Sequence, residues 1–331
     1  MRTQTGFACK TAVPVLGAVL LLGAVPSALA NPIDESAPDT VVQPAAVSAT
    51  QQQEVEAYWT LERMIAVGAP GPEDPREPTD AEWNKAGLVS KAVGRLFFTT
   101  PSDHMDRSCT ATITKGRTGT TVVTAAHCLG GDLQRTGNPT DPTFNPGQWN
   151  QNLYFVPGYK GDEQSKDKYM PYGGFTVRQM ITDKAWTTSR NPIGEGHDAA
   201  MVTLNTGKDK RTAAESAGAM PIAFTEEPSA SQKIYNFGYP YEGEIGNKNQ
   251  GARLVSCSGS ATGAPEGVHS SLRETCPLGR GASGGPHLTG FDEGTGLGTI
   301  VGVNSLGTGG RMYGTRLGKT AEALYRQAES L

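Results

Sequence analysis

The sequence predicts an all-β protein, and three observations support this fold class. Glycine and proline are both frequent, with 42 and 22 residues in a chain of 331, which favours turns over long helices. Short runs rich in β-branched and aromatic residues recur from Val93 onward, and Gly, Pro, Asn and Asp turns separate them. No repeat period stands out in this part of the chain. We therefore expect one large β-barrel or two small ones.

Individual elements follow from the local patterns. The runs with the strongest strand character are 93–99, 110–114, 121–125, 153–156, 199–204, 233–237 and 299–303. Apolar residues at three- and four-residue spacing predict a helix over 320–331. A similar but shorter pattern predicts one amphipathic helix over 55–66.

Residues 1–30 have the order of a signal peptide. Arg2 and Lys10 make the start positive, residues 13–25 form an uncharged apolar run, and Ala28-Leu29-Ala30 provides a cleavage site of small residues. The apolar run is shorter than the ~20 residues that a membrane-spanning helix needs. The sequence thus predicts a secreted, extracellular protein with no membrane association after signal cleavage.

Residues 31–91 differ in charge from the rest of the chain. They contain eleven acidic and four basic residues, and Ala, Gln and Pro are frequent. Such a segment ahead of a nearly neutral remainder predicts an acidic pro-region that is removed on maturation, with a cut near Lys91. A disordered, solvating leader without a role in folding or inhibition would have the same composition.

The cysteines predict disulfides. Cys9 lies in the signal peptide, which leaves Cys109, Cys128, Cys257 and Cys276, an even number in an exported protein. Three pairings are possible, and we favour Cys109–Cys128 and Cys257–Cys276. Each of these disulfides would close a loop of about 20 residues and stabilise the folded protein by about 3 kcal/mol. No C-x-x-C pair occurs, so no metal site is expected, and nothing indicates a cofactor.

The overall charge excludes one class of partner. The net charge is −4 and the pI is near 5.8, so the chain lacks the basic excess that phosphate binding requires. No nucleic-acid partner is expected, and the protein is expected to be a monomer.

His127 is the first candidate catalytic residue. It lies in Thr-Ala-Ala-His-Cys at the end of a strand-like run, where a disulfide through Cys128 would hold it in place. A serine hydroxyl is a poor nucleophile until a neighbouring imidazole takes its proton. His127 is therefore predicted to be a general base. No role is assigned to the remaining histidines, which are expected at the surface: His104, His197, His269 and His287.

Ser283 is the candidate nucleophile. It lies in Gly-Arg-Gly-Ala-Ser-Gly-Gly-Pro over 279–286, where glycines allow a tight turn with converging N–H groups. The amides of Gly281 and Ser283 are expected to form an oxyanion hole. The same residues match the G-x-S-x-G elbow of α/β-hydrolase esterases, although those enzymes place a helix directly after the serine.

Asp198 is the candidate acid. It precedes the apolar run 199–204, where a carboxylate could accept the second imidazole N–H and fix the tautomer of His127. Other acidic residues lie in polar or irregular contexts without a following apolar strand: Asp162, Asp167 and Asp183.

Together, TAAHC, HDAAMVTL and GRGASGGP, in the order His, Asp, Ser, resemble the chymotrypsin/trypsin-like serine protease superfamily over roughly 93–331. The resemblance implies two packed antiparallel β-barrels with a C-terminal helix and the triad in the cleft between them. It also implies a serine endopeptidase that hydrolyses a peptide or protein substrate through an acyl-enzyme. The expected domains are 92–215, with His127 and Asp198, and 216–331, with Ser283.

Two further matches extend the resemblance. Ser305, Leu306 and Gly307 match the strand that pairs with the substrate backbone in this family. The stretches 58–60 and 93–98 are similar to secreted actinobacterial trypsin-like peptidases, which carry a pro-region.

Departures from the family pattern concern activation and specificity. Ala282 replaces the aspartate that trypsins use to receive a new N-terminus, and Pro277 replaces the aspartate that selects Lys or Arg. Arg280, near the expected pocket entrance, could favour acidic residues, as in glutamyl endopeptidases, or be a solvated loop charge. Those enzymes commonly have a histidine where Asn304 stands here. A catalytically inactive binding protein on the same scaffold is the remaining alternative.

Overall fold

Two antiparallel sheets contain the strands of the described residues. The computed structural model describes residues 39–68, 76–131, 147–193, 195–225, 232–262, 272–308 and 310–331, and only 1, 3 and 6 before them. The predicted signal peptide therefore lies almost entirely outside the described residues. Both sheets belong to one compact unit, Ala37–Leu331.

The first sheet has seven strands in the order β1-β6-β5-β2-β3-β4-β7. Pairing of β6 with β7, for example Ile181 with Met201, closes six of them into a barrel, and β1 adds to β6 from outside. The strands are β1 Thr40–Pro44, β2 Val93–Thr99, β3 Asp106–Ile113, β4 Thr121–Thr124, β5 Gln151–Pro157, β6 Phe175–Asp183 and β7 Ala200–Leu204.

The second sheet has six strands in the order β10-β13-β12-β11-β8-β9. Among the described residues its two edge strands, β9 and β10, do not pair, so it forms a half-barrel. The strands are β8 Gln232–Gly238, β9 Val255–Ala261, β10 Leu272–Thr275, β11 Pro286–Asp292, β12 Leu297–Thr308 and β13 Arg311–Arg316.

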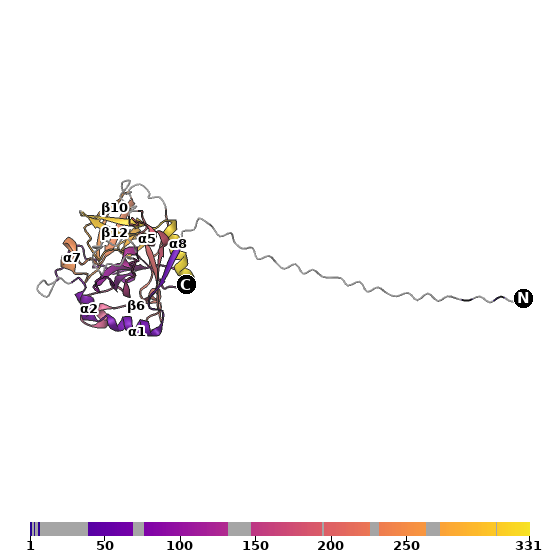
Figure 1. Ribbon diagram of the computed structural model, residues 1–331. Helices are drawn as coiled ribbons and strands as arrows, with labels where there is room; N and C mark the ends of the chain where they lie inside the picture. The colour runs from indigo at the N-terminus through magenta and orange to yellow at the C-terminus, as the bar shows by residue number, and fades with distance from the viewer. Residues whose placement is uncertain are drawn as a thin grey trace. The chain divides into compact units, whose positions relative to one another are not determined.

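Helices are short and lie outside the sheets. They are α1 Ala49–Tyr58, α2 Leu61–Ala66, α3 Val89–Ala92, α4 Lys166–Tyr169, α5 Lys184–Thr188, α6 Ala213–Ala217, α7 Gly243–Asn249 and α8 Lys319–Ser330, with one 3₁₀ turn, η1 Ala126–Cys128. In Figure 1, α1 and α2 lie near β6 and away from β10 and β12 of the second sheet. Of the residues described, none belongs to a helix long and apolar enough to span a membrane.

Both predicted disulfides are confirmed. Cys109 of β3 is joined to Cys128 of η1, and Cys257 of β9 to Cys276, which follows β10. The second disulfide therefore links the two edge strands of the half-barrel, where backbone pairing is missing.

The predicted strands and the helix at 320–331 are confirmed, but the single helix predicted over 55–66 is wrong. Two helices, α1 and α2, replace it and are separated by Trp59 and Thr60. The Thr60 hydroxyl caps α2 by accepting a hydrogen bond from the Arg63 amide, and the buried Trp59 indole donates to the Asn152 carbonyl at 2.6 Å. Burial of Trp59 thus interrupts a helix that the apolar spacing alone would continue.

The described part of the acidic segment 31–91 packs against the first barrel. Trp59 lies on Phe97, with ring centroids 5.2 Å apart. The buried guanidinium of Arg95 donates to the Val67 carbonyl at 2.6 Å and to the Ser108 hydroxyl at 2.8 Å. The boundaries 1–30, 31–91, 92–215 and 216–331 stay predictions.

Candidate active site

His127 lies in η1, directly after β4 of the first barrel. The Cys109–Cys128 disulfide ties this turn to β3, as expected from the sequence. The His127 side chain is 28% exposed, so one edge of the ring reaches solvent. A barrel strand and a disulfide therefore hold an imidazole at the edge of a buried region.

Asp198 contacts His127 twice. It is fully buried just before β7, and its Oδ1 accepts from the His127 backbone amide at 2.8 Å, while Oδ2 lies 2.8 Å from Nδ1. A carboxylate only accepts, so Nδ1 carries the hydrogen and Nε2 is left as the basic nitrogen of the neutral ring. The Ser305 hydroxyl donates to the same Oδ2 at 2.5 Å.

Ser283 lies in a tight loop whose backbone is held on both sides. Thr110 of β3 donates through its amide to the Ser283 carbonyl and through its hydroxyl to the Gly281 carbonyl, each at 2.8 Å. Gly281 and Gly284 have φ values of 95° and 78°, which only glycine adopts easily. The nucleophile loop, defined as residues 279–285 and named for the candidate nucleophile Ser283, is thus docked onto the first barrel.

The element after Ser283 excludes one alternative. The chain enters strand β11 at Pro286. An α/β-hydrolase elbow would instead start a helix there, within a parallel sheet. The esterase alternative is therefore wrong.

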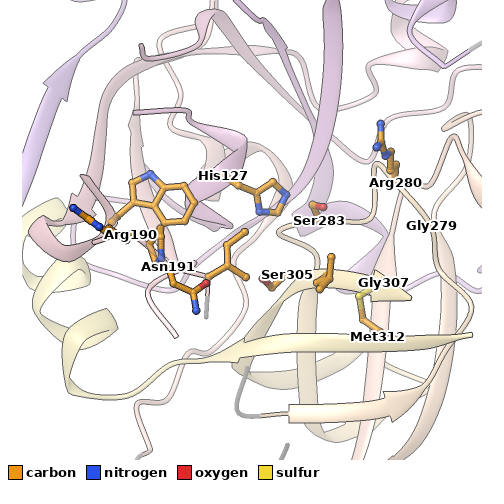
Figure 2. A pocket seen from close by; sticks show the side chains of 13 residues that line it. His127, Arg190, Asn191, Gly279, Arg280, Ser283, Ser305, Gly307 and Met312 are labelled. Atoms are coloured by element: carbon orange, nitrogen blue, oxygen red, sulfur yellow. The ribbon is translucent and has the colours of Figure 1, made fainter. Parts of the chain in front are cut away.

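His127 and Ser283 line one cavity of about 690 Å³. The same cavity is lined by the predicted substrate-binding residues Ser305, Leu306, Gly307 and Arg280. Figure 2 shows the His127 ring beside Ser283, with Ser305 below them. Residues far apart in the sequence thus meet at one opening.

Part of the cavity wall was not predicted. It comes from the segment that precedes Asp198 and from β13: Trp186, Arg190, Asn191, Pro192, Ile193 and Met312. In the sequence this segment lacks a motif, and its position depends on α5, which starts at the Asp183 cap. The one signal for this part of the cavity wall is that residues 186–193 come shortly before Asp198 in the sequence.

Two arginines flank the cavity. Arg280 is 77% exposed and lies 3.4 Å from Glu242, an acid that partly neutralises its charge. Arg190 lies on the opposite side in Figure 2. Since Arg280 remains mostly in solvent, its field at the cavity is screened.

Two histidines outside the predicted site have defined partners. His197, next to Asp198, places Nδ1 2.9 Å from Asp183, and the hydrogen bond to this carboxylate raises the pKa of His197. The prediction that His287 is a surface residue is wrong, because it is fully buried in β11. Burial lowers the pKa of His287 to about 4.

One cluster in the described residues places three metal-ligand types together: Cys109, His127 and Cys128. The two sulfurs are joined in a disulfide, so neither is available as a thiolate ligand. The cluster therefore does not fit a zinc site.

Comparisons with known proteins support the same fold. No protein-family model matches the sequence, and no curated protein does. The thermostable serine protease AL20 from an extremophilic microorganism is 29% identical with a TM-score of 0.59, and the match covers 73% of this chain and 99% of that one. Protease Anisep from Arthrobacter nicotinovorans is 25% identical with a TM-score of 0.60, and the match covers 75% of this chain and 99% of that one.

A Glu endopeptidase is 17% identical with a TM-score of 0.52 and covers 78% of this chain and 98% of its own, which shows the fold alone. The closed barrel, the half-barrel and the C-terminal helix also agree with this fold. The chain therefore has the chymotrypsin-like serine protease fold, and its resemblance to bacterial trypsin-like serine proteases is confirmed.

Proposed function

We propose that the protein is a secreted serine endopeptidase with His127, Asp198 and Ser283 as its catalytic triad. The observation that carries this proposal is the double contact of Asp198 with the backbone amide and Nδ1 of His127, both at 2.8 Å. These contacts orient the ring, and His127 lines the same cavity as Ser283.

The mechanism assigns one task to each group. Nε2 of His127 takes the hydroxyl proton of Ser283 while Oγ attacks the carbonyl carbon of a peptide bond. The amides of Gly281 and Ser283 bind the oxyanion. His127 then returns the proton to the leaving amine, and a water molecule hydrolyses the acyl-enzyme, which restores Ser283.

Substrate binding is proposed for the other predicted residues of the cavity. Ser305, Leu306 and Gly307 lie in β12, whose backbone would pair with an extended peptide. Arg280 would contact acidic groups of the substrate at the rim. Pro277 and Ala282 give no reason to expect the trypsin preference for Lys or Arg, or its activation switch.

Secretion rests on the predicted signal peptide 1–30 and on the two disulfides, which persist in oxidising surroundings. We retain the proposal that residues 31–91 are a pro-region and that the enzyme is a monomer. Peptides or proteins are the proposed substrates, with no nucleic acid and no cofactor.

Labelling with phenylmethylsulfonyl fluoride tests the proposal. The protein should be modified at Ser283 and lose peptidase activity, and Ser283→Ala should lower kcat by about 10⁶-fold. Ser258→Ala, an exposed serine of β9, is the control and should retain activity. A catalytically inactive binding protein would remain unlabelled at Ser283. Full peptidase activity of Ser283→Ala would contradict the triad.

A further inference from the structure

We propose that Asn304 is a positioning residue that orients the Ser283 amide toward the oxyanion. This inference rests on the proposed function, because it concerns the same nucleophile. Asn304 lies in β12 directly before Ser305 and is fully buried, so it does not touch substrate itself.

The Asn304 side chain has a single consistent orientation. Its Nδ2 donates to the carbonyls of Ala282 at 3.0 Å and Phe237 at 3.2 Å. Both are acceptors only, so the amide nitrogen must face them and Oδ1 must face His287. Oδ1 lies 2.8 Å from the Nε2 of His287.

His287 completes this arrangement as a donor. Since Oδ1 only accepts, Nε2 of His287 carries the hydrogen. The ring lies in β11 and packs so closely on β13 that a Cβ at Gly314 would overlap with it. His287 is thus held in place by the sheet, and it holds Asn304 in turn.

Peptide geometry connects Asn304 to the oxyanion. The Ala282 carbonyl and the Ser283 N–H belong to one trans peptide unit, so they point in opposite directions. Fixing the carbonyl on Nδ2 of Asn304 therefore fixes the direction of the amide. The Gly285 amide also donates to this carbonyl, at 3.0 Å.

The second oxyanion amide is oriented without a side chain. The Arg280 carbonyl, in the same unit as the Gly281 N–H, accepts from the Tyr241 backbone amide at 2.8 Å. Within the described part of the chain, neither the Gly281 nor the Ser283 amide donates a hydrogen bond. Asn304 is therefore the side chain on which the direction of one of the two amides depends.

The test compares Asn304→Ala with Asn236→Ala. Asn236, in β8, is also fully buried, but its side chain makes no hydrogen bond within the described residues. For Asn304→Ala we expect kcat to fall by about 10- to 100-fold, since losing an oxyanion donor outright costs about 10²–10³. KM should stay within about twofold, because ground-state binding does not use the oxyanion amides.

Two further measurements separate positioning from general damage. The affinity for a peptide boronic acid, whose tetrahedral adduct mimics the oxyanion, should fall by the same factor as kcat, while the affinity for a peptide product should not change. Asn304→Thr retains one hydroxyl donor and suits a strand, so its kcat should lie between those of Asn304→Ala and the wild type. Asn304→Thr also tests the inference if Asn304→Ala does not fold.

Equal kcat values for Asn304→Ala and Asn236→Ala, or a change in KM alone, would overturn the inference. If Asn304→Ala does not fold, a wild-type kcat in Asn304→Thr would overturn the inference instead. The proposed function fails separately, when the wild type is not labelled at Ser283. A labelled and active wild type with an unaffected Asn304→Ala variant rejects only the role of Asn304.

Discussion

Ser305 and His127 share one oxygen of Asp198. The Ser305 hydroxyl donates to Oδ2 at 2.5 Å, and Nδ1 of His127 lies 2.8 Å from the same atom. His127 follows a strand of the closed barrel, whereas Ser305 belongs to β12 of the half-barrel. A buried carboxylate thus joins the two sheets at the point where the cavity opens.

Replacing Asp198 with asparagine should lower kcat by about 10⁴-fold with little change in KM. An amide NH₂ in place of Oδ2 would favour the wrong tautomer of His127. Steady-state kinetics measure the effect. Asp183→Asn is the matched control, since Asp183 is a buried acid paired with His197 at 2.9 Å. Equal losses in the two variants would contradict the triad assignment.

Arg280→Gln should lower kcat/KM for peptides with an acidic residue by about two- to fivefold, because an exposed ion pair contributes at most about 1 kcal/mol. The effect should shrink as salt rises. Both this variant and Arg190→Gln, which changes an arginine on the opposite side of the cavity, are assayed with a library of peptides. An unchanged ratio of acidic to neutral peptides would mean that Arg280 is only a solvated charge.

His287 should make the protein sensitive to acid. Its pKa is about 4 in the folded protein because of burial, against about 6.5 when unfolded. Below pH 6.5 the unfolded chain binds a proton that the folded chain does not. The free energy of unfolding should therefore fall by about 3 kcal/mol between pH 6.5 and 4 and change little below that.

Urea unfolding at pH 7 and 4.5 measures this loss. In His287→Gln, which removes the titrating ring while keeping a donor, the difference between the two pH values should shrink by about 2 to 3 kcal/mol. The same pH dependence in both proteins would show that other groups cause it.

A protein that starts at Ala92 should be less stable than one that starts at Thr40. It lacks the Val67 carbonyl that the buried Arg95 guanidinium binds and the Trp59 ring on Phe97. The loss should be on the order of 5 kcal/mol, measured by thermal unfolding. Arg95→Met should recover part of the lost stability in the shorter protein, but should not stabilise the longer one. Equal stability of the two proteins would mean that these contacts do not stabilise the folded barrel.

Local motifs predicted the chemical groups, but not what surrounds them. His127, Asp198 and Ser283 each lie in a short stretch whose residue types indicate a role. Arg95, a charge within an apolar strand, gave no sign that carbonyls 28 and 31 residues earlier would bind it. Such contacts depend on how distant segments pack, which short-range periodicity does not encode.

The same limit applies to Asn304 and His287. Each looks ordinary in its strand, and their contact spans 17 residues. In the sequence, Asn304 stands out only as a departure from a family pattern. Its hydrogen bonds to Ala282 and Phe237 become visible once β12, β8 and the nucleophile loop are placed together.

Helix α8 has a consequence for the order in which the protein is made. Glu329 accepts hydrogen bonds from the Thr118 amide at 3.0 Å, in the turn before β4, and from the hydroxyl of Thr121, the first residue of β4, at 2.5 Å. β4 leads to His127, yet its acceptor lies 208 residues further along the chain. In a chain synthesised from its N-terminus, these hydrogen bonds can form only after the strands of both sheets have been made.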